Sequence, residues 1–235
     1  MTGRSPRGGR SVARGRLGQA ALFLLVAVAL AGCAGRPAPE TPAASPPAGL
    51  AEAVARGKAL LDAGDAEGAI AVLEPVAKGG SPSAEALFLL GNAYTQAGRL
   101  QEAEQAYRSA LALEPDDPDT LSNPGVVLYQ MQRPSEAVEQ FEKAARLLPD
   151  DAEIRYNLGG ALYTLGRVEE AIQAFEAARE RNPDLPQVYL GLGYAYRDQG
   201  EREKAIQHFQ TFLRLSDDEA WKAQVRQELE HLEEK

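Results

Sequence analysis

The sequence predicts an all-α protein, a solenoid of five helical hairpins that a C-terminal helix closes. Three observations predict this fold. Small residues recur every 34 positions, large apolar residues recur in the same register, and apolar positions inside each unit follow the three-to-four-residue spacing of an amphipathic helix. Prolines also stand at or near the ends of three units, at Pro115, Pro149 and Pro183.

Two small residues mark every unit. A glycine is expected where the two helices of a hairpin cross closely, because a larger side chain would push them apart. These repeat glycines are Gly57, Gly91, Gly125, Gly159 and Gly193. An alanine is expected at the same crossing on the second helix, and the repeat alanines are Ala69, Ala103, Ala137, Ala171 and Ala205. Four positions after each alanine comes a large apolar residue, which is expected to fill the gap to the next hairpin: Leu73, Tyr107, Phe141, Phe175 and Phe209.

The expected helix ends follow from turn and capping residues. Seven positions after each repeat glycine stands a residue expected to end the first helix in a left-handed conformation: Gly64, Gly98, Gln132, Gly166 and Gly200. The pair Asp117-Pro118 and the residue Asp151 are expected to start helices, because aspartate caps the first turn and proline suits the first helical position.

Two prolines interrupt this regular pattern. Pro75 falls inside the second helix of the first unit and should kink or shorten it. Pro124 falls inside the first helix of the third unit, where other units carry Leu90, Leu158 and Leu192. A proline in a helix interior costs about 3 kcal/mol. The substitution Pro124→Leu is therefore expected to raise the melting temperature, and the kink is either simply tolerated or reshapes the surface.

The pattern as a whole resembles the tetratricopeptide repeat, a helix–turn–helix unit of this length and residue spacing. The resemblance covers residues 50–217 and implies a right-handed solenoid. It divides the chain into the units 50–83, 84–117, 118–151, 152–185 and 186–217. Residues 218–235 are expected to form the polar helix that protects the open end of such an array.

The N-terminus predicts export rather than a folded domain. Residues 1–32 carry five arginines and no acid, and the apolar stretch Leu17–Leu30 is shorter than the roughly 20 residues that span a bilayer. This is the pattern of a secretory signal peptide. Residues 33–49 are rich in proline and alanine and are expected to form a tether of up to roughly 50 Å.

The end of the signal peptide indicates a lipid anchor. Leu30-Ala31-Gly32-Cys33 resembles the lipobox of bacterial lipoproteins, and Cys33 is the single cysteine of the chain. The resemblance implies that Cys33 is acylated. Ala34 stands where an inner-membrane retention signal has aspartate, so the resemblance implies an outer-membrane protein that faces the periplasm. The alternative is an ordinary signal peptide with a chance cysteine.

Composition excludes several functions. After residue 32 the chain carries 20 basic and 34 acidic side chains, a net charge of −14, which disfavours nucleic-acid binding. His208 and His231 lack metal-ligand spacing, and Gly79-Gly80-Ser81 lacks the lysine of a phosphate-binding loop. No nucleophile and base can be paired. We therefore expect no enzymatic activity, no cofactor, no metal and no small-molecule substrate.

A protein partner is expected instead, bound in the groove that the first helices line. This concave surface is implied by the resemblance. Side chains turned away from the packing stripe of those helices predict the groove, and the residues are Phe88, Asn92, Val126, Tyr129, Tyr156, Tyr163, Leu190, Tyr194 and Arg197. Its aromatic members suit a protein interface. The alternative is that several of the rings pack against neighbouring helices. Lys58 and Asn92 are isolated, so the carboxylate clamp of some relatives is not expected.

The expected function is to bind a partner protein at the outer membrane and to localise or assemble it. The chain resembles the repeat lipoproteins that act as pilotins for the secretin of type IV pili. Two alternatives remain open at this point: a scaffold that recruits peptidoglycan-active enzymes, and a structural subunit of an envelope assembly or export complex.

Overall fold

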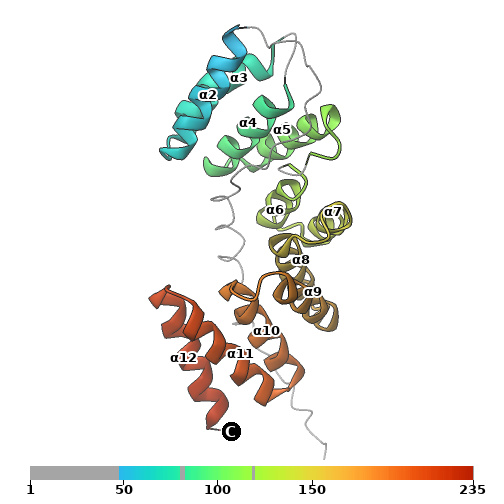
Figure 1. Cartoon of the computed structure of the whole chain (residues 1–235), viewed down its shortest axis with the longest axis vertical. Helices are drawn as coiled ribbons and strands as arrows, with labels where there is room; N and C mark the ends of the chain where they lie inside the picture. Colours follow the sequence, from blue (N-terminus) through green and yellow to red (C-terminus); the bar gives the residue numbers. More distant parts are fainter. Residues whose placement is uncertain (1–47, 80–82, 118–119, 235) are drawn as a thin grey trace, which may run out of the picture.

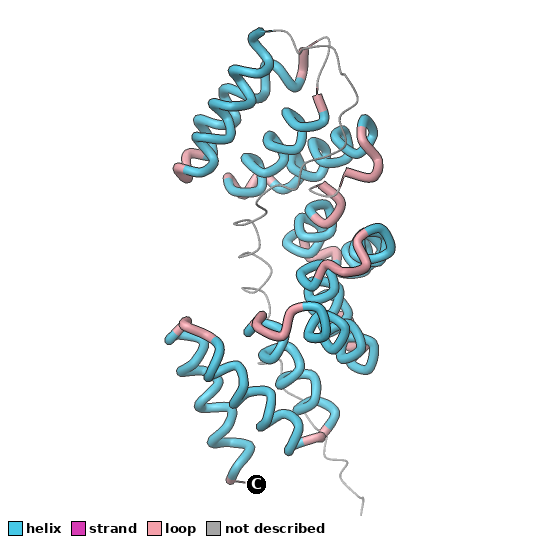
Figure 2. The backbone as a smooth tube through the Cα atoms, viewed as in Figure 1, coloured by secondary structure: helices cyan, strands magenta, loops and turns pink. Residues whose placement is uncertain are grey.

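The computed structural model describes residues 48–79, 83–117 and 120–234. Within these ranges it contains eleven helices and no strand (Figure 1; Figure 2). In chain order the helices are α2 (Ala48–Asp62), α3 (Ala66–Ala77), α4 (Ala84–Gln96), α5 (Leu100–Leu113), α6 (Asn123–Gln130), α7 (Pro134–Leu147), α8 (Ala152–Thr164), α9 (Val168–Arg181), α10 (Pro186–Gln199), α11 (Arg202–Leu215) and α12 (Glu219–Glu233). The all-α fold expected from the sequence is confirmed.

Consecutive helices pair as hairpins, and each hairpin stacks on the next. The pairs are α2–α3, α4–α5, α6–α7, α8–α9 and α10–α11, and α12 packs against α11. The array is curved. Figure 1 shows its two ends, α2 and α12, on the left of the view, while α7 and α9 form the outer side on the right. The first helices α4, α6, α8 and α10 therefore face the inside of the curve.

Each hairpin turn contains one residue in the left-handed conformation, and these are the five residues expected there: Gly64, Gly98, Gln132, Gly166 and Gly200. The turns share a pair of hydrogen bonds. In the second hairpin Gly98 N donates to Thr95 O over 3.0 Å, and Arg99 N donates to Tyr94 O over 2.8 Å. Such bonds satisfy carbonyl groups that a helix end leaves unpaired.

The repeat glycines lie directly beneath the large residues of the second helices. An ideal Cβ built on Gly91 would lie 2.6 Å from Cε1 of Tyr107. Phe175 is enclosed from two hairpins, because a Cβ on Gly159 would lie 2.6 Å from its ring and one on Gly191 would lie 2.7 Å from it. The large residue thus packs within its own hairpin as well as against the next. The repeat alanines are fully buried beside these contacts.

The two prolines behave differently from each other. Pro75 lies inside α3, which is 12 residues long, whereas the other four second helices have 14 residues. The expected shortening is therefore observed. Pro124 lies in the first turn of α6, so the expectation of a proline in the helix interior is wrong. A first-turn proline breaks no helical hydrogen bond. Pro124→Leu therefore restores no hydrogen bond, and any stabilisation would come only from the packing contacts of the new leucine.

The expected helix start at Asp117-Pro118 is also wrong. The helix α6 begins at Asn123 and is eight residues long. Before it, Thr120 N and Leu121 N donate to Asp117 O in a turn, and the Thr120 hydroxyl bonds the Asp117 carboxylate. Asp151, in contrast, caps α8 as expected, because its Oδ1 accepts from Ile154 N over 2.9 Å. Two prolines six residues apart offer two possible starts, and the chain uses the second.

Buried side chains form two main clusters that meet at α6. The first cluster joins α3, α4 and α5 and includes Val127 of α6. The second runs from Val126 and Leu128 of α6 to Val225 and Leu229 of α12. The helix α12 therefore covers the apolar face of the last hairpin, as expected of a closing helix.

Candidate partner-binding wall

The inner wall is the face that the first helices α4, α6, α8 and α10 turn toward the inside of the curve (Figure 1). The nine residues expected in the groove all come from these four helices. Cys33, the expected acylation site, lies outside the described residues. Lys58 is exposed on α2, and Asn92 lies at the same repeat position on α4.

The expectation that a row of free aromatic rings lines this wall is wrong. Only 2% of Tyr129, 6% of Tyr156, 6% of Tyr163 and none of Tyr194 is exposed. Val126 and Leu190 are buried with them. The physical reason is that neighbouring helices cover the rings. Tyr156 and Tyr194 pack against Phe175 and Phe209 on the second helix of their own hairpin, and Tyr129 and Tyr163 reach the following first helix. The ring of Phe88, tilted against Tyr107, remains partly exposed.

The tyrosine hydroxyls connect one unit to the next. Tyr129 Oη and Thr164 Oγ1 are 2.8 Å apart, and Tyr163 Oη donates to Asp198 Oδ2 over 2.6 Å. Each bond joins a residue to one that lies 35 positions later, on the following first helix. Burial raises the pKa of Tyr129 and of Tyr163, so both hydroxyls keep their protons. These residues therefore hold the units together rather than offer free anchors.

Arg197 extends this series to the closing helix. Its Nη1 donates to Glu228 Oε2 of α12 over 2.9 Å, and its Nη2 donates to Asp198 Oδ1 over 2.9 Å. The guanidinium also lies 4.8 Å from the centre of the Tyr194 ring, and Gln224 Nε2 donates to Tyr194 Oη over 3.2 Å. Arg197 is thus partly buried and satisfied by two carboxylates, and it does not present a free cation to a partner.

At the other end of the wall, Asn92 stands between two hairpins. Its Oδ1 accepts from Tyr107 Oη over 2.7 Å and from Asn123 Nδ2 over 3.4 Å. Asn92 remains partly exposed. Of the nine expected groove residues, Phe88, Asn92 and Arg197 therefore keep accessible surface of consequence.

What the wall leaves accessible is a row of polar side chains, one in each of the last four units. We name it the polar row, and its members are Gln96, Gln130, Thr164 and Asp198. They are spaced by 34 residues, so they occupy the same place on successive first helices. Gln96 and Asp198 are exposed, and Gln130 and Thr164 are partly exposed. The same periodicity that marks the glycines places these residues, from the sequence alone, on the face turned away from the packing stripe.

The described residues do not assemble a metal site. They contain no cluster of three or more His, Cys, Asp or Glu side chains that could hold a metal ion. His208 on α11 lies with its ring 5.4 Å from Tyr196 and 6.1 Å from Tyr189. No helix in the described ranges is both long and apolar enough to cross a bilayer.

A curved stack of helical hairpins with one polar row inside defines a helical-repeat protein. The comparisons name its class: a tetratricopeptide repeat model matches residues 54–118 and 125–186, and another matches residues 166–227. The chain belongs to the tetratricopeptide repeat family and is a protein–protein interaction module. A comparison with curated proteins finds no match.

Solved structures of this fold include two proteins of note. MamA from Desulfovibrio magneticus RS-1 aligns with a TM-score of 0.68 at 22% identity, over 74% of this chain and 100% of that one. MamA AMB-1 aligns with a TM-score of 0.60 at 28% identity, over 71% and 91%. YrrB, described as a TPR protein with an unusual peptide-binding site, aligns with a TM-score of 0.63 at 23% identity, over 76% and 92%.

Proposed function

We propose that this protein is a membrane-anchored adaptor that binds an extended segment of a partner protein along its inner wall and so localises or assembles that partner in the periplasm. The observation that carries the proposal is the polar row. Side-chain amides, a hydroxyl and a carboxylate recur at equivalent places on four successive first helices, and the hydroxyl and the carboxylate also bond Tyr129 and Tyr163. An extended polypeptide offers backbone N–H and C=O groups at a regular interval, which such a row can bind.

The charge of the wall favours a basic or neutral segment. Glu85 and Glu153 are exposed on the first helices, whereas Arg197 is already paired with Asp198 and Glu228. The chain after residue 32 carries a net charge of −14. Opposite charge on a partner would speed association and exclude acidic competitors.

Crosslinking from inside and outside the curve tests the adaptor role. A photoreactive benzoylphenylalanine is placed at Gln96 or Gln130 of the polar row, and at Gln101 or Gln173 on exposed faces of the second helices. The same partner should be captured from both inner positions and from neither outer position. The double substitution Gln96→Ala/Gln130→Ala should weaken capture, and the matched Gln101→Ala/Gln173→Ala should not. Equal capture from the outer positions would contradict the role of the inner wall.

The identity of the captured partner then distinguishes between the cellular processes that the protein could serve. A secretin subunit supports a role in type IV pilus assembly, which is our first proposal because of the resemblance to pilotins. A peptidoglycan hydrolase would instead support a cell-wall scaffold, and a barrel protein at fixed stoichiometry would support a structural subunit.

The anchor is tested separately. We propose acylation of Cys33 and retention at the outer membrane, on the strength of the lipobox sequence and of Ala34. The substitution Cys33→Ser should move the protein from the membrane fraction to the soluble periplasm. Two or more acyl chains anchor a protein stably in a membrane, and the variant has no acyl chain. Unchanged membrane association of that variant would argue against lipidation.

A further inference from the structure

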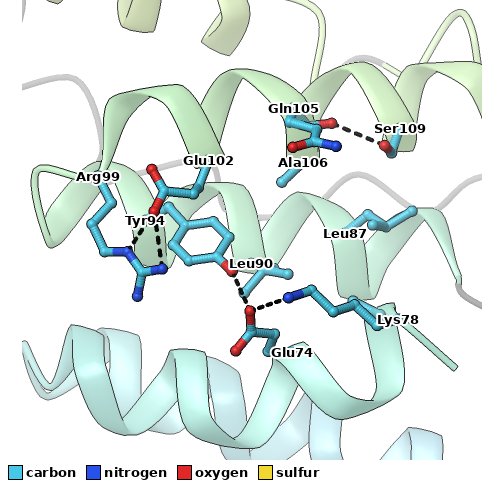
Figure 3. A pocket seen from close by; sticks show the side chains of 11 residues that line it. Glu74, Lys78, Leu87, Leu90, Tyr94, Arg99, Glu102, Gln105, Ala106 and Ser109 are labelled. Atoms are coloured by element: carbon cyan, nitrogen blue, oxygen red, sulfur yellow. Dashed lines mark hydrogen bonds and ion pairs between the residues drawn. The ribbon is translucent and has the colours of Figure 1, made fainter.

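The side of α4 that faces α3 and α5 offers neither an open ring nor a free charge. Tyr94 is only 4% exposed there, and its Oη donates to Glu74 Oε1 over 2.9 Å. The guanidinium of Arg99 lies 4.6 Å from the centre of the Tyr94 ring and bonds Glu102 Oε1 over 3.0 Å. Each charged side chain labelled in Figure 3 is paired with another. A partner must therefore use a different side of this helix.

The inner-wall side of α4 carries a carboxylate that is not paired. Glu85 is exposed, and within the described residues it forms no hydrogen bond and no ion pair. Lys58, the exposed cation of the preceding first helix α2, makes no bond with it. Glu85 lies in the first turn of α4, where the positive end of the helix dipole also stabilises a carboxylate. It is thus a free anion on the wall where the partner segment is proposed to lie.

An aromatic ring stands beside this carboxylate. Phe88 follows Glu85 by three positions, and residues at this spacing are neighbours on a helix, with about 5–6 Å between their Cβ atoms. The Phe88 ring is partly exposed and packs against the fully buried Tyr107 ring, with centres 6.2 Å apart and planes tilted by 51°. Asn92, one turn further along, already accepts from Tyr107 Oη over 2.7 Å through its Oδ1. We name the pair of Glu85 and Phe88 the Glu85–Phe88 site.

The repeat supplies an internal comparison for this site. Glu153 lies 68 positions after Glu85, at the same place in the fourth unit, and it is also exposed and without a bond to any described residue. Its neighbour at the place of Phe88 is Tyr156, of which only 6% is exposed. Among the first helices that the structure describes, α4 therefore differs from the others in having an accessible ring next to an unpaired carboxylate.

We propose that the Glu85–Phe88 site binds an arginine side chain of the partner segment, with the guanidinium stacked on the Phe88 ring and paired with the Glu85 carboxylate. The inference rests on the proposed function, because this arginine belongs to the segment that lies along the inner wall. A planar guanidinium can stack on a ring and pair with a carboxylate at the same time, whereas the ammonium of lysine is a compact and strongly hydrated charge. The net charge of −14 after residue 32 also attracts a basic side chain.

Titration with a small probe tests the site without a partner protein. The chain from residue 33 onward is labelled with ¹⁵N and carries Cys33→Ser, which prevents disulfide-linked dimers. It is titrated with N-acetyl-argininamide and with N-acetyl-citrullinamide, which has nearly the same shape but no charge. Backbone amide shifts should concentrate at Glu85 and Phe88 and should be larger with the arginine probe.

Two substitutions in the site and one matched control make the test specific. Glu85→Gln should weaken binding of the arginine probe about threefold, as expected for loss of an exposed ion pair. Phe88→Leu should weaken it to a similar degree, because leucine has no aromatic face. Leu190 occupies this place in the fifth unit, so the array accommodates a leucine there. Glu153→Gln makes the same change in charge at the equivalent place and should leave binding unchanged.

Several outcomes would overturn the arginine site. They are equal shifts with both probes, shifts centred on Glu153, equal weakening by Glu85→Gln and Glu153→Gln, and no shifts at millimolar probe concentrations. The polar row takes no part in these titrations, so the adaptor role is judged by the crosslinking test. A partner captured from the inner positions with the same yield by the Glu85→Gln variant would support the adaptor role and contradict the arginine site.

Discussion

At the scale of single residues, repetition explains both the regular positions and the exceptions. The left-handed turn position is glycine in four units, and the structure places all four at positive φ. In the third unit the position is Gln132, which adopts the same conformation with φ of 61°. The hydrogen bonds that end the helix are kept there, since Gln132 N donates to Tyr129 O and Arg133 N donates to Leu128 O. The packing of the array therefore imposes the left-handed conformation at this turn, and Gln132 adopts it although it is not glycine.

Gln132→Gly should stabilise the protein. Glycine adopts positive φ without the steric cost of a Cβ, so the free energy of unfolding should rise by about 1 kcal/mol. For a chain of this size the melting temperature should rise by about 2–4 °C in a circular-dichroism melt. Gly166→Gln, the reverse change at the equivalent position, should lower it. A fall in stability for Gln132→Gly would mean that the contacts of the glutamine side chain stabilise the protein by more than the steric cost of its Cβ.

His208 should make the protein sensitive to mild acid. Burial between Tyr189 and Tyr196, with a smaller effect of Arg179, lowers its pKa from 6.5 to about 4. The unfolded chain takes up a proton at higher pH than the folded chain does. The stability due to the neutral ring is thus complete above pH 6.5 and is lost as pH falls toward 4.

His208→Phe keeps a ring in place and cannot be protonated, so it should reduce the fall in melting temperature between pH 7 and pH 5. Both proteins carry the same carboxylates, which makes the difference between their pH profiles specific to residue 208. Identical profiles would show that the imidazole does not titrate differently in the folded state.

At the scale of helices and hairpins, packing across the hairpin is the main constraint. The repeat glycines, the left-handed turns and the shortened α3 follow from patterns within one unit, and the sequence was sufficient to predict them. The fate of the inner-wall tyrosines was not predictable in this way. A helical face turned away from its own partner can still be covered by the first helix of the next unit, as Tyr129 and Tyr163 are. The pattern within one unit does not show how closely the next unit packs against it.

Gly159→Ala should be strongly destabilising for so small a change. The added Cβ would lie 2.6 Å from the Phe175 ring, and Gly191 blocks the ring from moving to the other side. Overpacking of this kind costs about 1–3 kcal/mol. Urea unfolding would measure it, with Gly49→Ala as the control, because a Cβ there meets no atom within 4 Å. An unchanged urea midpoint for Gly159→Ala would show that the hairpins can shift apart freely.

At the scale of the whole molecule, stability depends on contacts between neighbours along the array. The sequence predicted the closing helix, and the structure shows how it is joined: Val225 and Leu229 are buried, and Glu228 pairs with Arg197. The start of α6 was missed, because Pro118 and Pro124 are both acceptable first-turn residues and only tertiary packing selects between them. The tyrosine side chains expected to be free on the first helices are buried, because neighbouring helices cover them.

Removal of residues 218–235 should expose the apolar face of the last hairpin. Each buried residue such as Val225 contributes about 1.5–3 kcal/mol, so the loss should lower the melting temperature substantially and increase binding of a hydrophobic dye. Val225→Ala should show a smaller effect in the same direction, and Glu228→Gln, which removes one of the two carboxylates paired with Arg197, should also destabilise less than the truncation. A truncated chain that melts like the full one would show that α12 is not a structural cap.

The brevity of α6 affects how the protein can accommodate a guest. Isolated helices need about 12–15 residues to persist in water, and α6 has eight, so its folding depends on the hairpins on either side. It is also the element where the two apolar clusters meet. Bending of the array should therefore concentrate at this one joint, and the aperture between the N-terminal and C-terminal arms can adjust there while the interior of each arm keeps its packing.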